Sequence, residues 1–105
     1  MAKRAMISQP MAGKTDGEIG AERIRVMKIL EEMEYEVVNT FFTEEDVEEA
    51  EHVALSFLGK SIEAMSHCDA VFFCPGWWNA RGCRIEHEIA LAYGLEILTE
   101  GGEAE

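Results

Sequence analysis

The chain has 105 residues and a formal net charge of −12, because 21 acidic residues outnumber 9 basic ones. That length fits one domain, and so negative a field repels polyphosphate backbones, so we expect no nucleic-acid polymer as a partner. No apolar segment approaches the length of a membrane span and no signal peptide is recognisable. The odd count of 3 cysteines is more typical of a cytoplasmic protein than of a disulfide framework.

The first half of the chain alternates short apolar runs with helical spacing. A run that stops at a turn signal predicts a strand over Ala5–Ser8. Apolar residues three and four positions apart then predict a helix that begins within 16–18 and ends near Glu34. A segment rich in β-branched residues predicts a strand over Tyr35–Thr40. Helical spacing returns over Val47–Ser66, which predicts one long or broken helix.

The second half repeats this alternation. Asp69–Pro75 is an almost unbroken apolar run, which is typical of a strand covered on both faces. A helix is predicted over Cys83–Tyr93 and a short strand over Glu96–Thr99. The order predicts an α/β fold: a small doubly wound, flavodoxin- or Rossmann-like parallel sheet of about four strands with helices on both faces. We expect one domain over residues 1–98 and a disordered acidic tail over 99–105.

In such sheets, ligands bind beyond the carboxyl ends of the strands. The loop after the first strand ends in Gly13, Lys14 and Thr15, as a triphosphate-binding P-loop does. Ser8 stands where the first glycine of that motif should be, and Pro10 stiffens the segment. These departures argue against a triphosphate site. Two readings remain: a turn whose backbone N–H groups hold one phosphate or a sugar, and a plain connection.

The loop after the third strand carries Trp77 and Trp78. Two adjacent tryptophans in an extended segment cannot both point into the core. One of them could stack on a base or fill a subunit interface, and simple packing is the alternative. Arg81 and Arg84 are scarce positive charges near the start of the next helix, where they could hold an anion or pair with nearby glutamates.

Glu86 lies in the first turn of the predicted helix, where the helix dipole favours an ionised carboxylate. A positioned carboxylate is what nucleophilic displacement at a sugar carbon needs, although acidic residues also stabilise first turns without any chemistry. The helical spacing predicts that Ile85, Ile89 and Ala92 pack on the sheet, with His87 on a solvated face. The cysteines and histidines lack metal-ligand spacing, so we expect no metal and no cofactor.

Three segments together resemble a known family: ISQPMAGKT at Ile7–Thr15, DAVFFCPGW at Asp69–Trp77 and ARGCRIEHEIALAYG at Ala80–Gly94. They are similar to small, functionally uncharacterised bacterial and phage proteins over nearly the whole chain. Those proteins resemble the nucleoside 2-deoxyribosyltransferase superfamily, which includes the 2′-deoxynucleoside 5′-phosphate N-hydrolases. The pattern shared with the characterised enzymes is met here by Gly82, Glu86, Ala90 and Gly94.

The resemblance implies that Glu86 attacks C1′ of a deoxyribose, that the base departs, and that water or a second base takes the sugar. It implies a nucleoside or its 5′-monophosphate as ligand and at least a homodimer, with each site bordered by a neighbouring subunit. From the two loops and the resemblance together, the residues expected to contact the ligand are Ser8, Gln9, Pro10, Met11, Gly13, Lys14, Ser61, Asp69, Gly76, Trp77, Trp78, Arg81 and Gly82.

Two positions depart from the characterised enzymes. Ser61 stands where those enzymes carry a sugar-binding aspartate, and Ala80 stands where the hydrolases carry a phosphate-binding serine. Both departures favour an alternative in which the same pocket binds a nucleotide or nucleotide-sugar without turnover. A further alternative is an oligomeric interaction protein in which the tryptophans and Glu86 serve a subunit interface, joined by His87 and Glu88.

Overall fold

The computed structural model of the chain describes residues 2–38 and 51–100. The predicted end of the second strand, the predicted start of the second helix and the last five residues of the tail lie outside these ranges. In chain order the elements are β1 (Lys3–Ser8), α1 (Asp16–Glu32), β2 (Tyr35–Val37), α2 (Val53–Met65), β3 (Ala70–Phe73), the 3-10 helix η2 (Trp77–Asn79), α3 (Arg81–Ala92) and β4 (Glu96–Thr99). Within the described ranges, no helix is both long and apolar enough to cross a membrane.

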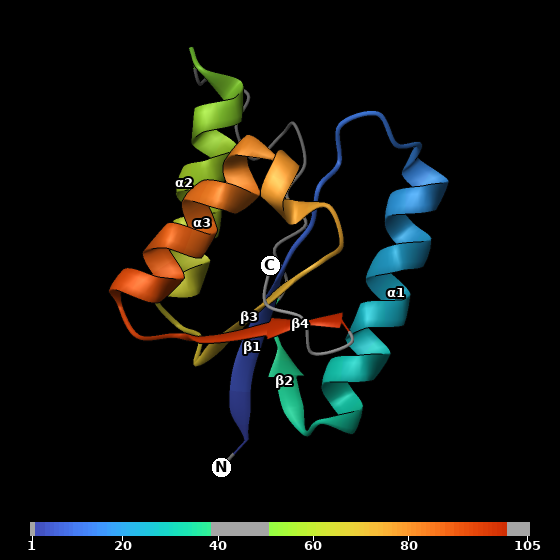
Figure 1. The fold of residues 1–105 in the computed structure, drawn as a ribbon, viewed down its shortest axis with the longest axis vertical. Coiled ribbons are helices and arrows are strands. Elements are labelled where there is room, and N and C mark those ends of the chain that lie inside the picture. Colours follow the sequence, from blue (N-terminus) through green and yellow to red (C-terminus); the bar gives the residue numbers. More distant parts are fainter. Residues whose placement is uncertain (1, 39–50, 101–105) are drawn as a thin grey trace.

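All four strands run parallel in one sheet, in the spatial order β2-β1-β3-β4 (Figure 1). The predicted parallel α/β fold is therefore confirmed. β1 and β3 lie at the centre, and their pairing register sets Ser8 opposite Phe73. All side chains of β3 are buried, as expected of a central strand that is covered on both faces. The carboxyl ends of the two central strands consequently meet at one edge of the sheet.

Helices cover both faces of the sheet: α1 lies on one side, and α2 and α3 lie on the other (Figure 1). Alternate side chains of the central strands serve the two faces, because successive residues of a strand point in opposite directions. Met6, Val71 and Phe73 belong to the core cluster that includes residues of α2 and α3. Ile7 and Phe72 belong to the cluster that includes residues of α1. The sheet is thus the middle layer of a three-layer domain.

Several element boundaries differ from the predicted ones. β1 begins at Lys3 because its exposed first residues still pair through the backbone with β2, which hydrophobicity does not reveal. α1 ends at Glu32, and Glu34 adopts a left-handed conformation with φ of +70°. α2 continues through Gly59, the position considered for a break. α3 begins at Arg81, two residues earlier than its apolar spacing indicated.

The segment that resembled the end of a P-loop is a turn followed by a helix cap. Gly13 has φ of +80°, and the N–H of Lys14 donates to the carbonyl of Met11 at 3.2 Å. The Thr15 hydroxyl accepts from the N–H of Glu18 at 3.1 Å, and the Glu18 carboxylate accepts from the N–H of Thr15 at 2.9 Å. This reciprocal pair is a capping box, which satisfies N–H groups that the first helical turn leaves without partners.

Thr15→Ala should lower the free energy of unfolding by about 1 kcal/mol, because the replacement leaves the Glu18 N–H without its side-chain acceptor. Urea denaturation followed by circular dichroism measures the change. Thr15→Ser keeps the accepting hydroxyl and is the matched control, with no loss of stability expected because serine is at least as good an N-cap residue. Equal losses in the two variants would contradict this role for the cap.

Candidate active-site cleft

A cleft of about 470 Å³ opens beyond the carboxyl ends of the central strands. Its walls come from the loop after β1, from α1 and α2, and from the segment that leads into α3. This volume lies within the range of small-molecule sites. Both loops identified from the sequence thus contribute to one cavity. The predicted ligand contacts that line it are Ser8, Gln9, Pro10, Met11, Ser61, Arg81 and Gly82, together with the predicted nucleophile Glu86.

The carboxylate of Glu86 is buried in the wall of this cleft, and the residue is 7% exposed. The hydroxyl of Ser8 donates a hydrogen bond to its Oε1 atom at 2.5 Å. Burial raises the pKa of the Glu86 carboxyl, whereas hydrogen bonding to Ser8 and Ser61 lowers it. A carboxylate held in this way at a cavity wall can act as a nucleophile or as a base.

Ser8 owes its position to the pairing of the central strands. It is the last residue of β1 and only 2% exposed, and its carbonyl accepts from the N–H of Cys74 at 3.0 Å. Its side chain points toward α3, where it also lies within hydrogen-bonding reach of the Cys83 thiol. Burial raises the pKa of Cys83 to about 11, so this thiol is neutral near pH 7.

Gln9 ties the loop after β1 to helix α1. Its side-chain Nε2 donates to the carbonyl of Ile19 at 2.9 Å and to the carboxylate of Glu22 at 3.0 Å. Its Oε1 accepts from the guanidinium of Arg23 at 3.3 Å. Lys14 pairs with Glu22 at 3.3 Å, and neither Lys14 nor Gly13 is among the described residues that line the cleft. These contacts give the loop a fixed shape before any ligand arrives.

The lining of the cleft is more positive than the rest of the chain. Arg23 and Arg81 line it, whereas Glu86 is the only acidic residue among the described lining residues. The formal charge of the whole chain is −12, so this local balance is unusual. Burial lowers the pKa of the Arg23 guanidinium, which nevertheless remains charged near neutral pH. Sequence reasoning missed Arg23 because it lies among alternating charges on α1, a pattern typical of a solvated helix face.

The first turn of α3 also contributes to the cleft. Ala80, Arg81, Gly82 and Cys83 line the cavity, and the capping residue Ala80 offers no side-chain hydrogen bond to the first N–H groups. The amino end of a helix carries a partial positive charge, so it adds to the charge of the two arginines. Apolar lining faces these polar groups: Pro10 and Met11 in the loop after β1, and Ala54, Phe57 and Leu58 on α2. These three apolar residues of α2 were not predicted to line the cleft.

Of the two adjacent tryptophans, one is buried and the other is exposed, as predicted from their being neighbours in the chain. Trp77 is buried and stacks on His87, with ring centroids 4.2 Å apart and planes 19° apart, and it also contacts Phe73. Trp78 is 52% exposed. Neither is among the described residues that line the cleft. Phe57 is instead the aromatic side chain available there for a planar ligand.

The buried face of α3 differs from the predicted one. Its buried residues are Cys83, Glu86, His87 and Ala90. Ile85 is exposed, and so is Ala92. The prediction was wrong for Ile85 and Ala92, whereas Ile89 packs partly buried against the core cluster. The solvated position predicted for His87 was also wrong. The sheet-facing side of this helix accepts polar residues because Ser8 bonds to Glu86 and because Trp77 and Phe73 pack on the imidazole.

Two further predicted contacts lie elsewhere. Asp69 comes just before β3, at the opposite edge of the sheet, and its carboxylate accepts from the N–H of Arg4 at 2.9 Å. It therefore does not join the cleft. Gly76 has φ of +88°, which L side chains rarely adopt, and it begins the turn into η2. A Cβ added there would lie 3.9 Å from the ring of Pro10, so Gly76 shapes the turn beside the cleft.

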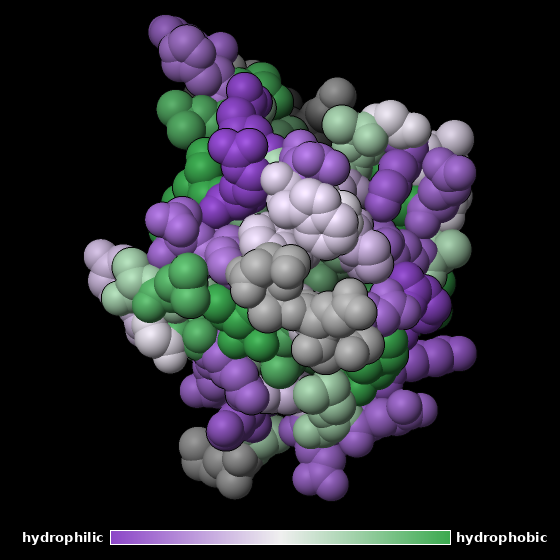
Figure 2. All heavy atoms as spheres, in the orientation of Figure 1, coloured by the Kyte–Doolittle hydropathy of each residue, from purple (hydrophilic) through white to green (hydrophobic). Residues whose placement is uncertain are grey.

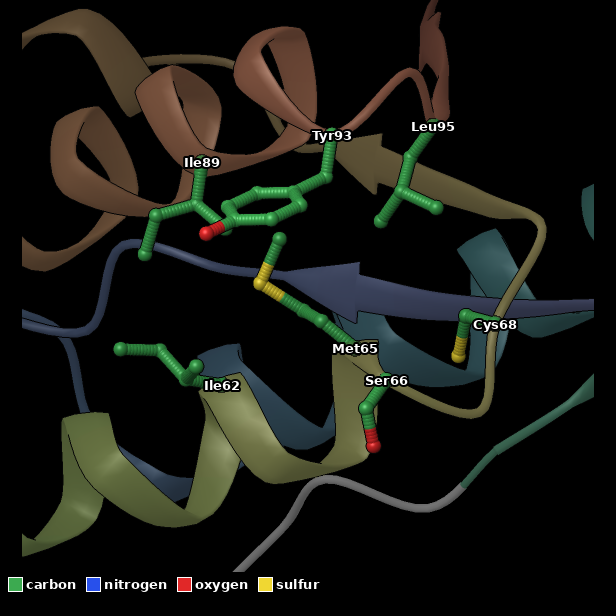
Figure 3. A pocket seen from close by; sticks show the side chains of 7 residues that line it. All are labelled: Ile62, Met65, Ser66, Cys68, Ile89, Tyr93 and Leu95. Carbon is green, nitrogen blue, oxygen red and sulfur yellow. The ribbon is translucent and has the colours of Figure 1, made fainter.

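A second pocket of about 500 Å³ lies at the far end of α2 and α3 (Figure 3). Met65, Ile89, Tyr93 and Leu95 point into it, and no acidic or basic residue belongs to its lining. Burial raises the pKa of Cys68, its only titratable thiol, to about 11. Over residues 2–38 and 51–100, no group of three or more His, Cys, Asp or Glu side chains could hold a metal ion. The polar cleft is therefore the better candidate for chemistry.

Comparison with protein families identified a match over most of the chain. The model of a family described as a domain of unknown function (DUF4406) matches residues 3–99 of the chain. The match includes β1 to β4 and every cleft residue discussed above. The search of curated proteins gave no match, and the search of solved structures gave none either.

Proposed function

Because the chain belongs to the DUF4406 family, a family of domains of unknown function, we propose its activity from the cleft: cleavage or exchange of the N-glycosidic bond of a (deoxy)nucleoside or its 5′-monophosphate. Glu86 is the nucleophile at the sugar C1′. The observation that carries this proposal is the buried Glu86 carboxylate, hydrogen-bonded by Ser8 in a cleft that the loop after β1 also lines. The resemblance to the nucleoside 2-deoxyribosyltransferase superfamily supports the same role for this glutamate.

The proposed reaction has two displacements at C1′. A carboxylate oxygen of Glu86 forms a bond to C1′ through an oxocarbenium-like transition state, while the electron pair of the C1′–N bond leaves with the base. The departing base takes up a proton. In the second step, water attacks C1′, loses a proton and releases the Glu86 carboxylate, which completes hydrolysis. A second base that attacks in place of water would complete a transfer.

The charges of the cleft favour a substrate with an anionic group. Arg23 and Arg81 offer two guanidinium groups, and the amino end of α3 adds its dipole. A phosphate would gain from this local positive charge, whereas a neutral nucleoside carries no charge to interact with it. The apolar side chains of Met11, Phe57 and Leu58 are suited to the faces of a base or a deoxyribose. Among the candidates, a 5′-monophosphate fits best.

A second candidate is binding without turnover. Ala80 has no hydroxyl where the resembled hydrolases bind phosphate, and Ser61 has no carboxylate where the resembled enzymes hold the sugar. Such a module would sense a nucleotide through the same cleft. Saturable binding of a deoxynucleoside 5′-monophosphate by calorimetry, with no base released over many hours, would favour this candidate over the enzyme.

The direct experiment offers the protein a panel of deoxynucleosides and their 5′-monophosphates, with and without a free acceptor base. Chromatography then separates intact substrate, released base and exchanged nucleoside. We expect base release from at least one 5′-monophosphate and faster turnover than with the matching nucleoside. If no member of the panel is bound, and none releases or exchanges its base, both candidates are contradicted.

We also propose that a second copy of the chain closes the cleft. A groove of about 650 Å³ adjoins it and shares Ala54, Leu58, Arg81 and Gly82 with its lining. Leu55 is 63% exposed beside this groove, where Val53 and Ile85 are also exposed. Figure 2 shows such hydrophobic patches between hydrophilic residues on the side of α2 and α3. An exposed apolar surface that continues an active-site wall is typical of a subunit interface.

Leu55→Glu should therefore convert a dimer into a monomer, because each interface would have to bury two extra charges. Sedimentation velocity at micromolar concentration measures the change. Leu91→Glu is the matched control, since Leu91 is similarly exposed on α3 but is not among the residues that line the groove or the cleft. A monomeric wild-type protein, or equal dissociation by both variants, would contradict the proposed interface.

A further inference from the structure

We propose that Ser8 and Ser61 are positioning residues that hold the Glu86 carboxylate, rather than contacts for the ligand. The part of this inference that concerns turnover rests on the proposed function. The sequence pointed to both serines as ligand contacts. The Ser8 hydroxyl instead donates to Glu86 at 2.5 Å, and Ser61 lines the same cleft, where its hydroxyl lowers the pKa of Glu86. A hydroxyl that donates its only proton to a protein carboxylate cannot donate the same proton to a sugar or a phosphate.

Three elements of the fold converge on this one carboxylate. Ser8 comes from the end of β1, Ser61 from α2 and Glu86 from α3. The Ser8 Oγ to Glu86 Oε1 distance is 2.5 Å, and both residues are buried. A largely buried ionised carboxylate requires hydrogen-bond donors, and hydroxyls supply them without adding charge. The serines therefore orient the carboxylate and favour its ionised form against the burial that opposes it.

The direction of the hydrogen bond follows from the chemistry of the groups. An ionised carboxylate only accepts, so the Ser8 proton must point to Glu86. Cys83 is also within hydrogen-bonding reach of Ser8, and its thiol is neutral because burial raises its pKa to about 11. A thiol sulfur is only a weak acceptor, so the ionised Glu86 carboxylate is the favoured acceptor of the Ser8 proton.

Few other charged or titratable groups among the described lining residues can influence the pKa of Glu86. Within the described lining of the cleft, α1 presents Arg23, and α3 presents Arg81 and the neutral Cys83. β1 and α2 present no titratable side chain there. Hydrogen bonds from Ser8 and Ser61 lower the pKa of Glu86 against the burial that raises it. Loss of either hydroxyl should therefore raise the pKa of Glu86.

The pKa of Glu86 can be measured directly by carbon-13 NMR of its side-chain carboxyl group, assigned by the signal that Glu86→Gln removes. Ser8→Ala and Ser61→Ala should each raise this pKa by about one unit, since a hydrogen bond to a charged group commonly accounts for that much. Ser61→Thr should restore the wild-type value. Ser66→Ala is the matched control, because Ser66 follows α2 at its far end and its hydroxyl bonds to the carbonyl of Glu63.

An unchanged pKa in both alanine variants would overturn the proposed role of the serines, whatever the activity. With a deoxynucleoside 5′-monophosphate as probe, the acid limb of kcat/KM should move to higher pH in the same two variants, while Ser66→Ala leaves it in place. A shift seen by NMR without turnover of any substrate would support the serine contacts and count against the proposed function. Turnover whose acid limb does not shift in the two variants would support the proposed function and count against the role of the serines.

Discussion

Glu86→Gln is expected to reduce base release from a deoxynucleoside 5′-monophosphate by about 1,000-fold or more, because an amide cannot form the glycosyl ester of the first displacement. The amide has nearly the same shape, and its oxygen can still accept from Ser8. Binding should survive, so calorimetry with the same ligand should give an affinity within a few-fold of wild type. Quench-flow or chromatographic assays at saturating substrate measure the loss.

The same variant should not unfold the protein. The folded-state pKa of Glu86 is raised above its ordinary value of 4.5, so its contribution to stability is complete below that pH and is lost as the pH rises through the folded-state pKa. Glutamine does not titrate, and the variant should lack this part of the pH dependence. Thermal unfolding from pH 4 to pH 8 checks the sign. Base release by Glu86→Gln at the wild-type rate would contradict the role of Glu86 as nucleophile. An unfolded variant would indicate a structural role for Glu86 instead.

Arg23→Met is expected to reduce kcat/KM for a 5′-monophosphate by roughly 10- to 100-fold, as the loss of a charge-assisted hydrogen bond implies. The matching nucleoside should lose little, because it carries no phosphate. Methionine retains an unbranched apolar side chain in place of the arginine stem, which limits the loss of packing. Steady-state kinetics on the two substrates measure the selective effect.

The control for this change is Arg25→Met. Arg25 lies on the same helix, pairs with Glu22 and Glu100, and does not belong to the described lining of the cleft. It should leave the preference for a phosphate unchanged. Arg23 also donates to Gln9, so an equal loss with nucleoside and monophosphate would show that Arg23 acts by shaping the loop after β1 and does not bind the phosphate.

Much of the fold could be predicted because its elements are separated by clear local signals. The apolar run over 70–73 is buried on both sides, and the run over 5–8 lies beside it, so the two central strands carry the strongest pattern. Parallel pairing followed from the helices between the strands. The meeting of the two loops in one cleft followed in turn, since parallel strands bring their carboxyl ends to the same edge.

The contents of the cleft were harder to predict, and Arg23 and Phe57 illustrate the reason. Both lie on helices, outside the two loops predicted to bind the ligand, and both enter the cleft only because α1 and α2 pass beside it. Trp77 and Asp69 were predicted to contact the ligand but do not line the cleft. Trp77 stacks on His87, and the Asp69 carboxylate accepts a hydrogen bond from the N–H of Arg4. Residue type alone does not reveal whether a partner within the chain already occupies a group.

The sequence by itself determined the order of the elements, the parallel sheet and the position of Glu86 near the start of a helix at the ligand edge. Only the tertiary structure decided which face of α3 is buried and which groups hold Glu86. The reason is physical: periodicity reports where apolar residues gather, but a buried carboxylate becomes acceptable only when donors such as Ser8 and Ser61 reach it from other elements. Those donors lie 78 and 25 positions away in the chain, and only folding brings them to the carboxylate.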